Sequence, residues 1–313
     1  LGFVFPTKPT LTSLIFGWHP EWTMLTICVV ITGMYLAGAR RLKQQAIAWP
    51  PLRTTSFLLG TFLLAWATSS GISRYAMVSF ASHMIQHMTL SMLAPIFLVL
   101  GAPITLALRA LPATSDHNMR NPRQWITSLL HSRYAVFIAH PLIVLAIFTF
   151  GLYGMYFTPL FGSLMASHTG HLFMEIHFLL SGVLFAFIVI GVDPAPRAVP
   201  AIARLLIVLV AISLHAFFAI AIMQSTVPIG NAWYSQVRPP WIENPLDDTY
   251  TGGGIAWAIG EIPSLILMVI VAVQWARSDA RIASRLDRQA DRDGDSELNA
   301  YNEYLASLNK EPS

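Results

Sequence analysis

Charged side chains are scarce in this chain: of its 313 residues, 11% are Asp, Glu, Lys or Arg, whereas 55% are hydrophobic. An ordinary soluble domain carries roughly 25% charged residues, so the composition excludes a soluble enzyme of this size. The few charges are also unevenly placed, because many follow residue 276 and long stretches elsewhere have none. This distribution predicts a protein that crosses a membrane several times.

Cysteine is nearly absent, since Cys28 is the only one in the chain. A lone cysteine excludes an intramolecular disulfide framework and a cysteine-rich metal site, so metal ligands would have to be His, Met or carboxylate side chains. No expected span contains a lysine, which disfavours retinal binding. Neither a phosphate loop nor a pair of nucleophile and base stands out, and we therefore expect a protein that is not an enzyme.

Apolar runs long enough to cross about 30 Å of hydrocarbon as helices recur along the chain. They lie near residues 22–38, 54–71, 76–100, 134–152, 166–191, 201–225 and 254–276. We expect an all-α polytopic membrane protein, with a seven-helix transmembrane bundle in residues 1–276 and a polar cytoplasmic tail at 277–313. Residues 101–112 are amphipathic and either lie on the membrane surface or extend the third span.

Lysine and arginine indicate the direction of insertion. Sixteen of them fall in alternate connections and in the tail, whereas the other connections hold only Lys8, Arg74 and Arg238. Positive residues favour the cytoplasmic side, so the N-terminus is expected outside and the C-terminus inside. The excess of positive charge is thus a signal of topology, and nucleic acid is not an expected partner.

With this orientation, histidines from several spans fall at one depth in the outer half of the membrane. His83 and His87 are one helical turn apart and share a face, which is a spacing that allows two imidazoles to hold one metal ion. At matching depths lie two histidines of the fifth span, one of the sixth, and the only acidic residues well inside any span: His171, His177, His215, Glu175 and Glu261. Ionisable groups within a membrane normally face the bundle interior and mark an ion path, a cofactor or a proton relay.

Methionines accompany these histidines, among them Met84, Met88 and Met174. Thioether ligands select Cu(I) over harder ions, so the combination favours copper, as Cu(I). The alternatives are that each histidine only hydrogen-bonds a neighbouring helix and that each methionine only fills the core. His168 is expected at the outer end of the fifth span, on the path of an arriving ion, and Glu261 is expected to support the site rather than bind the metal.

Several blocks of sequence resemble one known family. They are His83-Met-Ile-Gln-His87, Gly170-His-Leu-Phe-Met-Glu-Ile-His-Phe178, Gly191-Val-Asp-Pro194, His215-Ala-Phe-Phe218 and Gly252-Gly-Gly-Ile-Ala-Trp-Ala-Ile-Gly-Glu-Ile-Pro263. Together they are similar to the CtaG family of cytochrome c oxidase assembly proteins, and the ending is similar to the actinobacterial branch. That branch is often fused behind a CopD-like region, which we expect to precede Leu1.

The resemblance implies a multi-pass protein of the bacterial plasma membrane that helps to place copper in the copper B centre of the oxidase. Its motif histidines correspond to His83, His87, His171, His177 and His215. The implied partners are subunit one of cytochrome c oxidase or its assembly intermediates, with a copper donor protein or the CopD-like region on the supply side. Two alternatives stay open, namely a copper or proton-coupled transporter and a haem-binding membrane protein.

Overall fold

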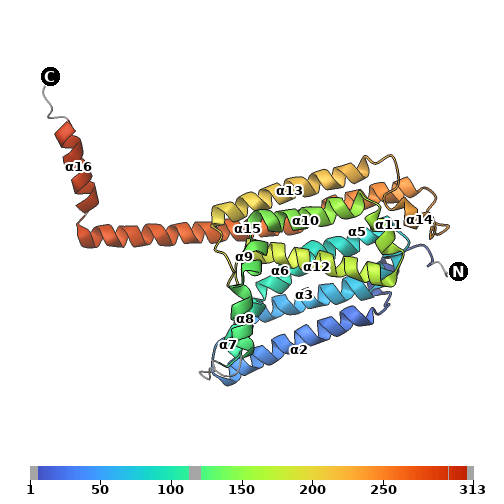
Figure 1. Cartoon of the computed structure of the whole chain (residues 1–313), viewed down its shortest axis with the longest axis horizontal. Coiled ribbons are helices and arrows are strands. Elements are labelled where there is room, and N and C mark those ends of the chain that lie inside the picture. Colours follow the sequence, from blue (N-terminus) through green and yellow to red (C-terminus); the bar gives the residue numbers. More distant parts are fainter. Residues whose placement is uncertain (1–5, 113–120, 295, 309–313) are drawn as a thin grey trace.

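The computed structural model describes residues 6–112, 121–294 and 296–308, and within these ranges it contains helices and no strand. The expected all-α class is therefore confirmed for the described chain. Figure 1 shows long helices lying side by side, with the end of one of them, α15, projecting far beyond the others.

The bundle consists of long helices joined by short ones. The long elements are α2 (Trp22–Gln44), α3 (Pro51–Ser69), α10 (Pro141–Tyr156), α12 (His168–Ile190), α13 (Ala201–Met223), α15 (Pro245–Asp293) and the composite of α5 (Phe80–Met88), η1 (Thr89–Leu93) and α6 (Ala94–Leu100). The short ones are α1 (Leu11–Phe16), α4 (Gly71–Ala76), α7 (Pro103–Ala110), α8 (Pro122–Leu130), α9 (Arg133–Ile138), α11 (Leu160–Met165), α14 (Asn231–Tyr234) and, after the projecting end, α16 (Ser296–Leu308).

Five of the described helices are long and apolar enough to cross a membrane: Trp22–Gln44, Phe80–Ala110, His168–Ile190, Ala201–Met223 and Pro245–Arg292. The chain is therefore a multi-pass membrane protein. Helix α10 is apolar but has only 16 residues, and α3 has 19 residues that include Arg53 and several hydroxyl side chains. Five spans follow from length and composition, while seven spans and their direction stay predictions.

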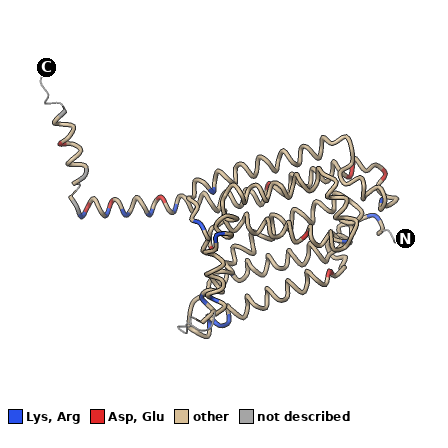
Figure 2. Tube along the Cα trace, in the orientation of Figure 1, with Lys and Arg blue, Asp and Glu red and all other residues tan. Residues whose placement is uncertain are grey.

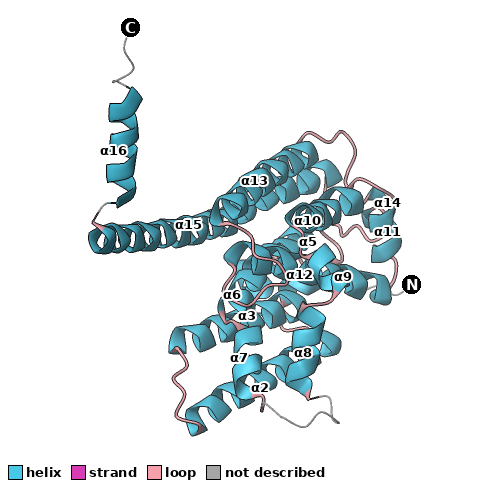
Figure 3. Ribbon diagram, turned by 60° about the vertical axis from the view of Figure 1, so that its left-hand side comes forward, coloured by secondary structure: helices cyan, strands magenta, loops and turns pink. Residues whose placement is uncertain are grey.

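Two helix boundaries differ from those expected from the sequence, and a proline or a residue with left-handed backbone conformation lies at each. The long helix of the fourth apolar run, α10, begins at Pro141 rather than at residue 134. Proline has no N–H to donate inside a helix, so it is favoured in the first turn, where that N–H is not needed. Segment 101–112 lies largely within the candidate span Phe80–Ala110, but a break in the helix divides that span. Ala102 has φ +49°, which separates α7 from α6, and Figure 3 shows α7 and α8 crossing the ends of the long helices.

The turn that separates α5 from α6 is a widened, π-helical one, and it follows directly after the two histidines of α5. Pro95 accounts for this, since it cannot donate to the carbonyl of Ser91 four residues earlier and its ring crowds that carbonyl. Gly182 of α12 packs against the same carbonyl, because a Cβ at Gly182 would lie 2.0 Å from the Ser91 oxygen. The close approach of α12 to the third span therefore requires glycine.

We expect Gly182→Ala to lower the stability of the protein, because the added methyl group must push α12 away from η1. Overpacking of this kind costs about 1–3 kcal/mol. The measurement is the thermal unfolding midpoint of the detergent-solubilised protein. Gly33→Ala in α2 is the matched control, since a Cβ at Gly33 meets no atom within 4 Å. Equal midpoints for the two variants would contradict the packing described here.

Candidate metal centre

Three histidines from two helices converge inside the bundle. His83 and His87 come from successive turns of α5, and His171 comes from the first half of α12. One ring nitrogen of each lies within 4.8 Å of those of the other two. His83 and His87 are fully buried and His171 is 7% exposed, so the cluster is shielded from bulk water.

The nitrogens of these three rings lack protein partners where the rings face one another. Both ring nitrogens of His83 and the Nε2 atoms of His87 and His171 are buried without a hydrogen bond. A buried polar atom without a partner costs about 1–3 kcal/mol, and native proteins keep few of them. Convergent unpaired imidazole nitrogens therefore fit a metal ion better than they fit a packed core.

The opposite nitrogens of two rings are held by neighbouring side chains. The Tyr156 hydroxyl lies 2.7 Å from His87 Nδ1, and Glu175 Oε1 lies 3.5 Å from His171 Nδ1. Gln86 in turn donates from Nε2 to the same Glu175 oxygen at 2.6 Å. In the tautomer in which His87 donates from Nδ1 to the Tyr156 oxygen, its Nε2 presents a lone pair, which is the usual arrangement around metal-binding histidines.

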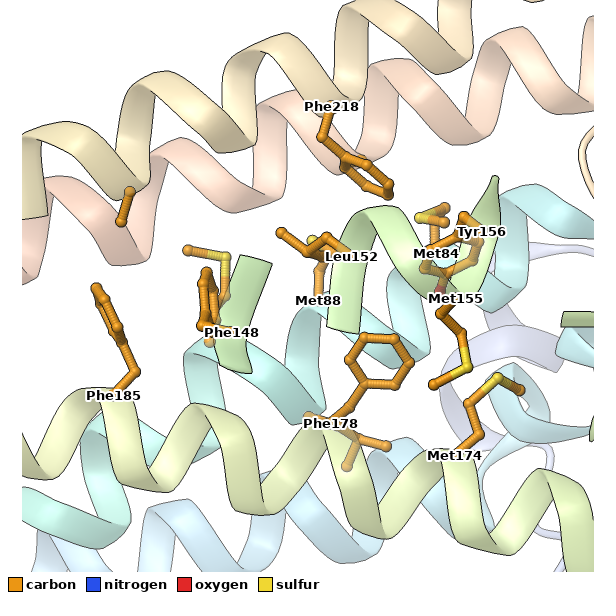
Figure 4. Close-up of a cluster of buried hydrophobic side chains, with 14 of the residues drawn as sticks. Met84, Met88, Phe148, Leu152, Met155, Tyr156, Met174, Phe178, Phe185 and Phe218 are labelled. Carbon is orange, nitrogen blue, oxygen red and sulfur yellow. The ribbon is translucent and has the colours of Figure 1, made fainter. Parts of the chain in front are cut away.

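The surroundings of the three histidines are aromatic and sulfur-rich. Phe161 lies edge-on to the His83 ring with centroids 5.0 Å apart, and Phe178 lies 4.2 Å from the His87 ring. Figure 4 shows the sulfur atoms of Met84, Met88, Met155 and Met174 within the same buried core. Met88 contacts a histidine through its sulfur, which lies 3.2 Å from His215 Nε2. The association of Met84 and Met174 with the three converging histidines stays a prediction.

One positioning residue was not anticipated from the sequence. Asp248, near the start of α15, accepts hydrogen bonds at the start of α5 from the Phe80 N–H at 2.7 Å and from the Ser79 hydroxyl at 2.8 Å. It thereby caps the helix three residues before His83. Asp248 and Phe80 are 168 positions apart in sequence, so no local sequence pattern could have revealed their contact.

Two further predicted ligands lie outside the convergent group. His177 is only half-buried and faces α10, where a Cβ on Gly151 would come 2.9 Å from its Nε2 atom. His215 Nε2 lies 3.2 Å from the sulfur of Met88, and its ring packs so closely on Gly260 of α15 that a Cβ there would clash. His215 and Met88 thus form a mixed nitrogen and sulfur pair, and Met88 follows His87 in the sequence of α5, whereas His177 faces α10.

The remaining predicted residues occupy the rim of the bundle and its outer faces. His168 is exposed at the first position of α12, with Nε2 3.7 Å from Glu21 Oε2. Glu261 is exposed on α15 and accepts a hydrogen bond from Trp257 Nε1 at 2.6 Å. Glu175, by contrast, is buried and contacts the histidine cluster directly through His171.

Residues 33–278 match the family described as cytochrome c oxidase caa3 assembly factor (Caa3_CtaG). The chain belongs to this family. The match contains all three converging histidines of this Caa3_CtaG member, as well as Tyr156, Glu175 and the capping Asp248. The resemblance seen in the sequence is thereby confirmed.

Similar chains occur in mycobacteria. Proteins called uncharacterized in Mycobacterium bovis and Mycobacterium tuberculosis are each 41% identical to this Caa3_CtaG member over 311 residues, and one in Mycobacterium leprae is 40% identical. These matches include 99% of this chain but 47% of each relative, so the chain spans about half the length of the curated relatives it matches. No solved structure matches the chain.

We expect Asp248→Ala to destabilise the start of α5 and to loosen the histidine cluster. Loss of a capping side chain costs about 0.5–2 kcal/mol, and here it also leaves the Phe80 N–H without its partner. The thermal unfolding midpoint of the purified protein should fall. Asp247→Ala is the matched control, because Asp247 is the exposed neighbour on the same turn of α15. An effect of Asp247→Ala as large as that of Asp248→Ala would contradict the capping role.

Proposed function

We propose that this assembly factor binds copper, as Cu(I), at His83, His87 and His171 and passes it to cytochrome c oxidase at the copper B centre. The observation that carries the proposal is the convergence of three buried imidazoles whose facing nitrogens have no protein partner. The family supplies the oxidase as the recipient complex. In this role copper is cargo, and the protein acts as a metallochaperone rather than as an enzyme.

The donor set and its surroundings favour Cu(I). Three imidazole nitrogens without a directly converging carboxylate suit a soft monovalent ion better than Mg²⁺, Ca²⁺ or Mn²⁺. The apolar walls of phenylalanine and methionine side chains favour an ion of low charge, because burial of a charge costs less when the charge is small. His215 and Met88 offer an adjacent pair of the soft donor types.

We further propose seven spans in the bacterial plasma membrane, with the N-terminus outside and the C-terminus in the cytoplasm. Figure 2 supports the direction, since Lys and Arg gather at the end of the bundle from which α15 projects. Parts of the 101–133 connection and of the tail that enter the count of positive residues lie outside the described residues. In this orientation the histidine cluster lies in the outer half, and copper arrives from the outside.

The geometry disfavours a haem protein as the alternative. The rings of His83 and His87 have centroids 3.9 Å apart, and His171 lies 5.9 Å from His83, which leaves no room between them for a macrocycle. A Soret band in the optical spectrum of the purified protein would contradict this conclusion. A copper transporter remains the second candidate, because the histidine cluster would serve a transported ion equally well.

We expect His83→Ala and His87→Ala each to lower the affinity for Cu(I) by about tenfold or more, since even loss of a supporting residue costs 10–100-fold at metal sites. The measurement is competition for Cu(I) against a soluble chelator of known affinity, combined with oxidase activity in cells that carry each variant. His131→Ala is the matched control, because His131 is an exposed histidine distant from the cluster. Unchanged affinity in both cluster variants would overturn the copper site.

We expect a cysteine introduced by Ser235→Cys to react in intact cells with a thiol reagent that cannot cross membranes. The native Cys28 is buried, so labelling reports on the introduced residue. Ser284→Cys on the projecting part of α15 is the control and should react only after the membrane is opened. The reverse pattern would overturn the proposed orientation.

A further inference from the structure

A cleft of about 380 Å³ leads from the surface of the bundle to the histidine cluster. Its outer wall carries exposed ionisable side chains, and its inner wall carries His171 and Glu175, which belong to the cluster described above. The residues that matter for the argument are His19, Glu21, Arg74, Met165, His168 and His171. We call this cleft the vestibule.

The outer residues of the vestibule are fixed in place by the chain around them. The N–H of His19 donates to the carbonyl of Ser69 at 2.8 Å, and the N–H of Glu21 donates to the Ser69 hydroxyl at 3.2 Å. Ser69 itself is fully buried at the end of α3. One carboxylate oxygen of Glu21 caps α2 through the Thr23 N–H, while the other lies 3.7 Å from His168 Nε2.

The histidines form a series of steps from the mouth of the vestibule inward. His168 and His171 are three residues apart on α12 and therefore lie on the same side of the helix. The ring of His171 lies 5.9 Å from that of His83, which in turn lies 3.9 Å from that of His87. His168 is exposed and His83 is fully buried, so the series runs from solvent through His171 on the vestibule wall to a buried histidine beyond it.

From this arrangement we propose that His19, Glu21 and His168 form an intake site that captures Cu(I) and hands it to His171, and from there to His83 and His87. The inference rests on the proposed copper function and adds the route by which the ion arrives. Imidazole nitrogens are good ligands for copper, and the buried sulfur of Met165 on the vestibule wall provides a soft donor. The Glu21 carboxylate attracts the cation electrostatically, whereas the Arg74 guanidinium on the same cleft repels it.

The test separates the rate of copper loading from the final occupancy. The full chain in lipid nanodiscs is mixed with Cu(I) held by a weak, uncharged coloured chelator, so that the complex keeps the positive charge of the ion, and the loss of the coloured complex is followed in time. We expect the triple variant His19→Ala, Glu21→Gln and His168→Ala to load about tenfold more slowly than wild type at low salt, with the same copper per chain at the end. The Glu21→Gln change keeps an oxygen for the Thr23 N–H, and His131→Ala is the control that should load at the wild-type rate.

A second variant tests the sign of the electrostatic effect. Arg74→Gln should load faster than wild type, because it removes a positive charge from the vestibule, and added salt should reduce the difference. Because loosening of the fold could also expose the buried histidines and speed loading, the salt dependence decides: a rate gain for Arg74→Gln that added salt leaves unchanged would contradict electrostatic guidance.

The outcomes decide between the two proposals. If wild type takes up copper and the triple variant loads as fast as His131→Ala, the intake site is wrong and the copper site stands. If the triple variant loses copper at equilibrium, its residues are ligands of the final site, and the intake role is again wrong. If wild type takes up no Cu(I), both the copper function and the intake site are overturned.

Discussion

The structure depends on one costly feature, which is a group of imidazole nitrogens buried in apolar surroundings without protein partners. Four such nitrogens belong to the trio formed by His83, His87 and His171. At about 1–3 kcal/mol for each unpaired group, their burial opposes folding by an amount comparable to a large part of the stability of an ordinary domain. An ion bound by one nitrogen of each ring would offset part of this cost, so the proposed copper binding would also stabilise the fold.

The surrounding helices hold the trio together by contacts that are distant in sequence. Helix α15 contributes most, because Asp248 caps α5 before the histidines and Gly260 lets α15 pack against His215. On the other side, Gly182 allows α12 to approach the widened turn that Pro95 causes after His87. The position of His171 relative to the α5 pair is therefore set by three separate close approaches rather than by any one helix.

Part of this site could be predicted from the sequence. The direction in which each side chain points and the contacts between distant helices could not. The spacing of His83 and His87 places them on one face of a helix, and helical rise places His171 at their depth, and the structure brings these three together. Depth alone does not specify the direction in which a side chain points around its helix. That is why Glu261, at a similar expected depth, faces outward to Trp257, and why His177 faces α10. Asp248 could not be found at all, since its contact with α5 depends on tertiary packing.

The two ends of the bundle differ in a way that bears on the choice between delivery and transport. Toward the outer end, the trio is joined to the vestibule by His171 and Glu175. Toward the other end, the buried residues of α12 beyond Ser181 are glycine or have apolar side chains. The buried residues of α6 are all apolar. Moving a cation through such a region without polar ligands costs much free energy, because the charge loses its hydration. Within the described residues of these two helices, an ion bound at the trio would enter and leave most easily through the vestibule. A site that is filled and emptied from one side suits a protein that hands copper to a neighbouring complex better than one that carries it across the membrane.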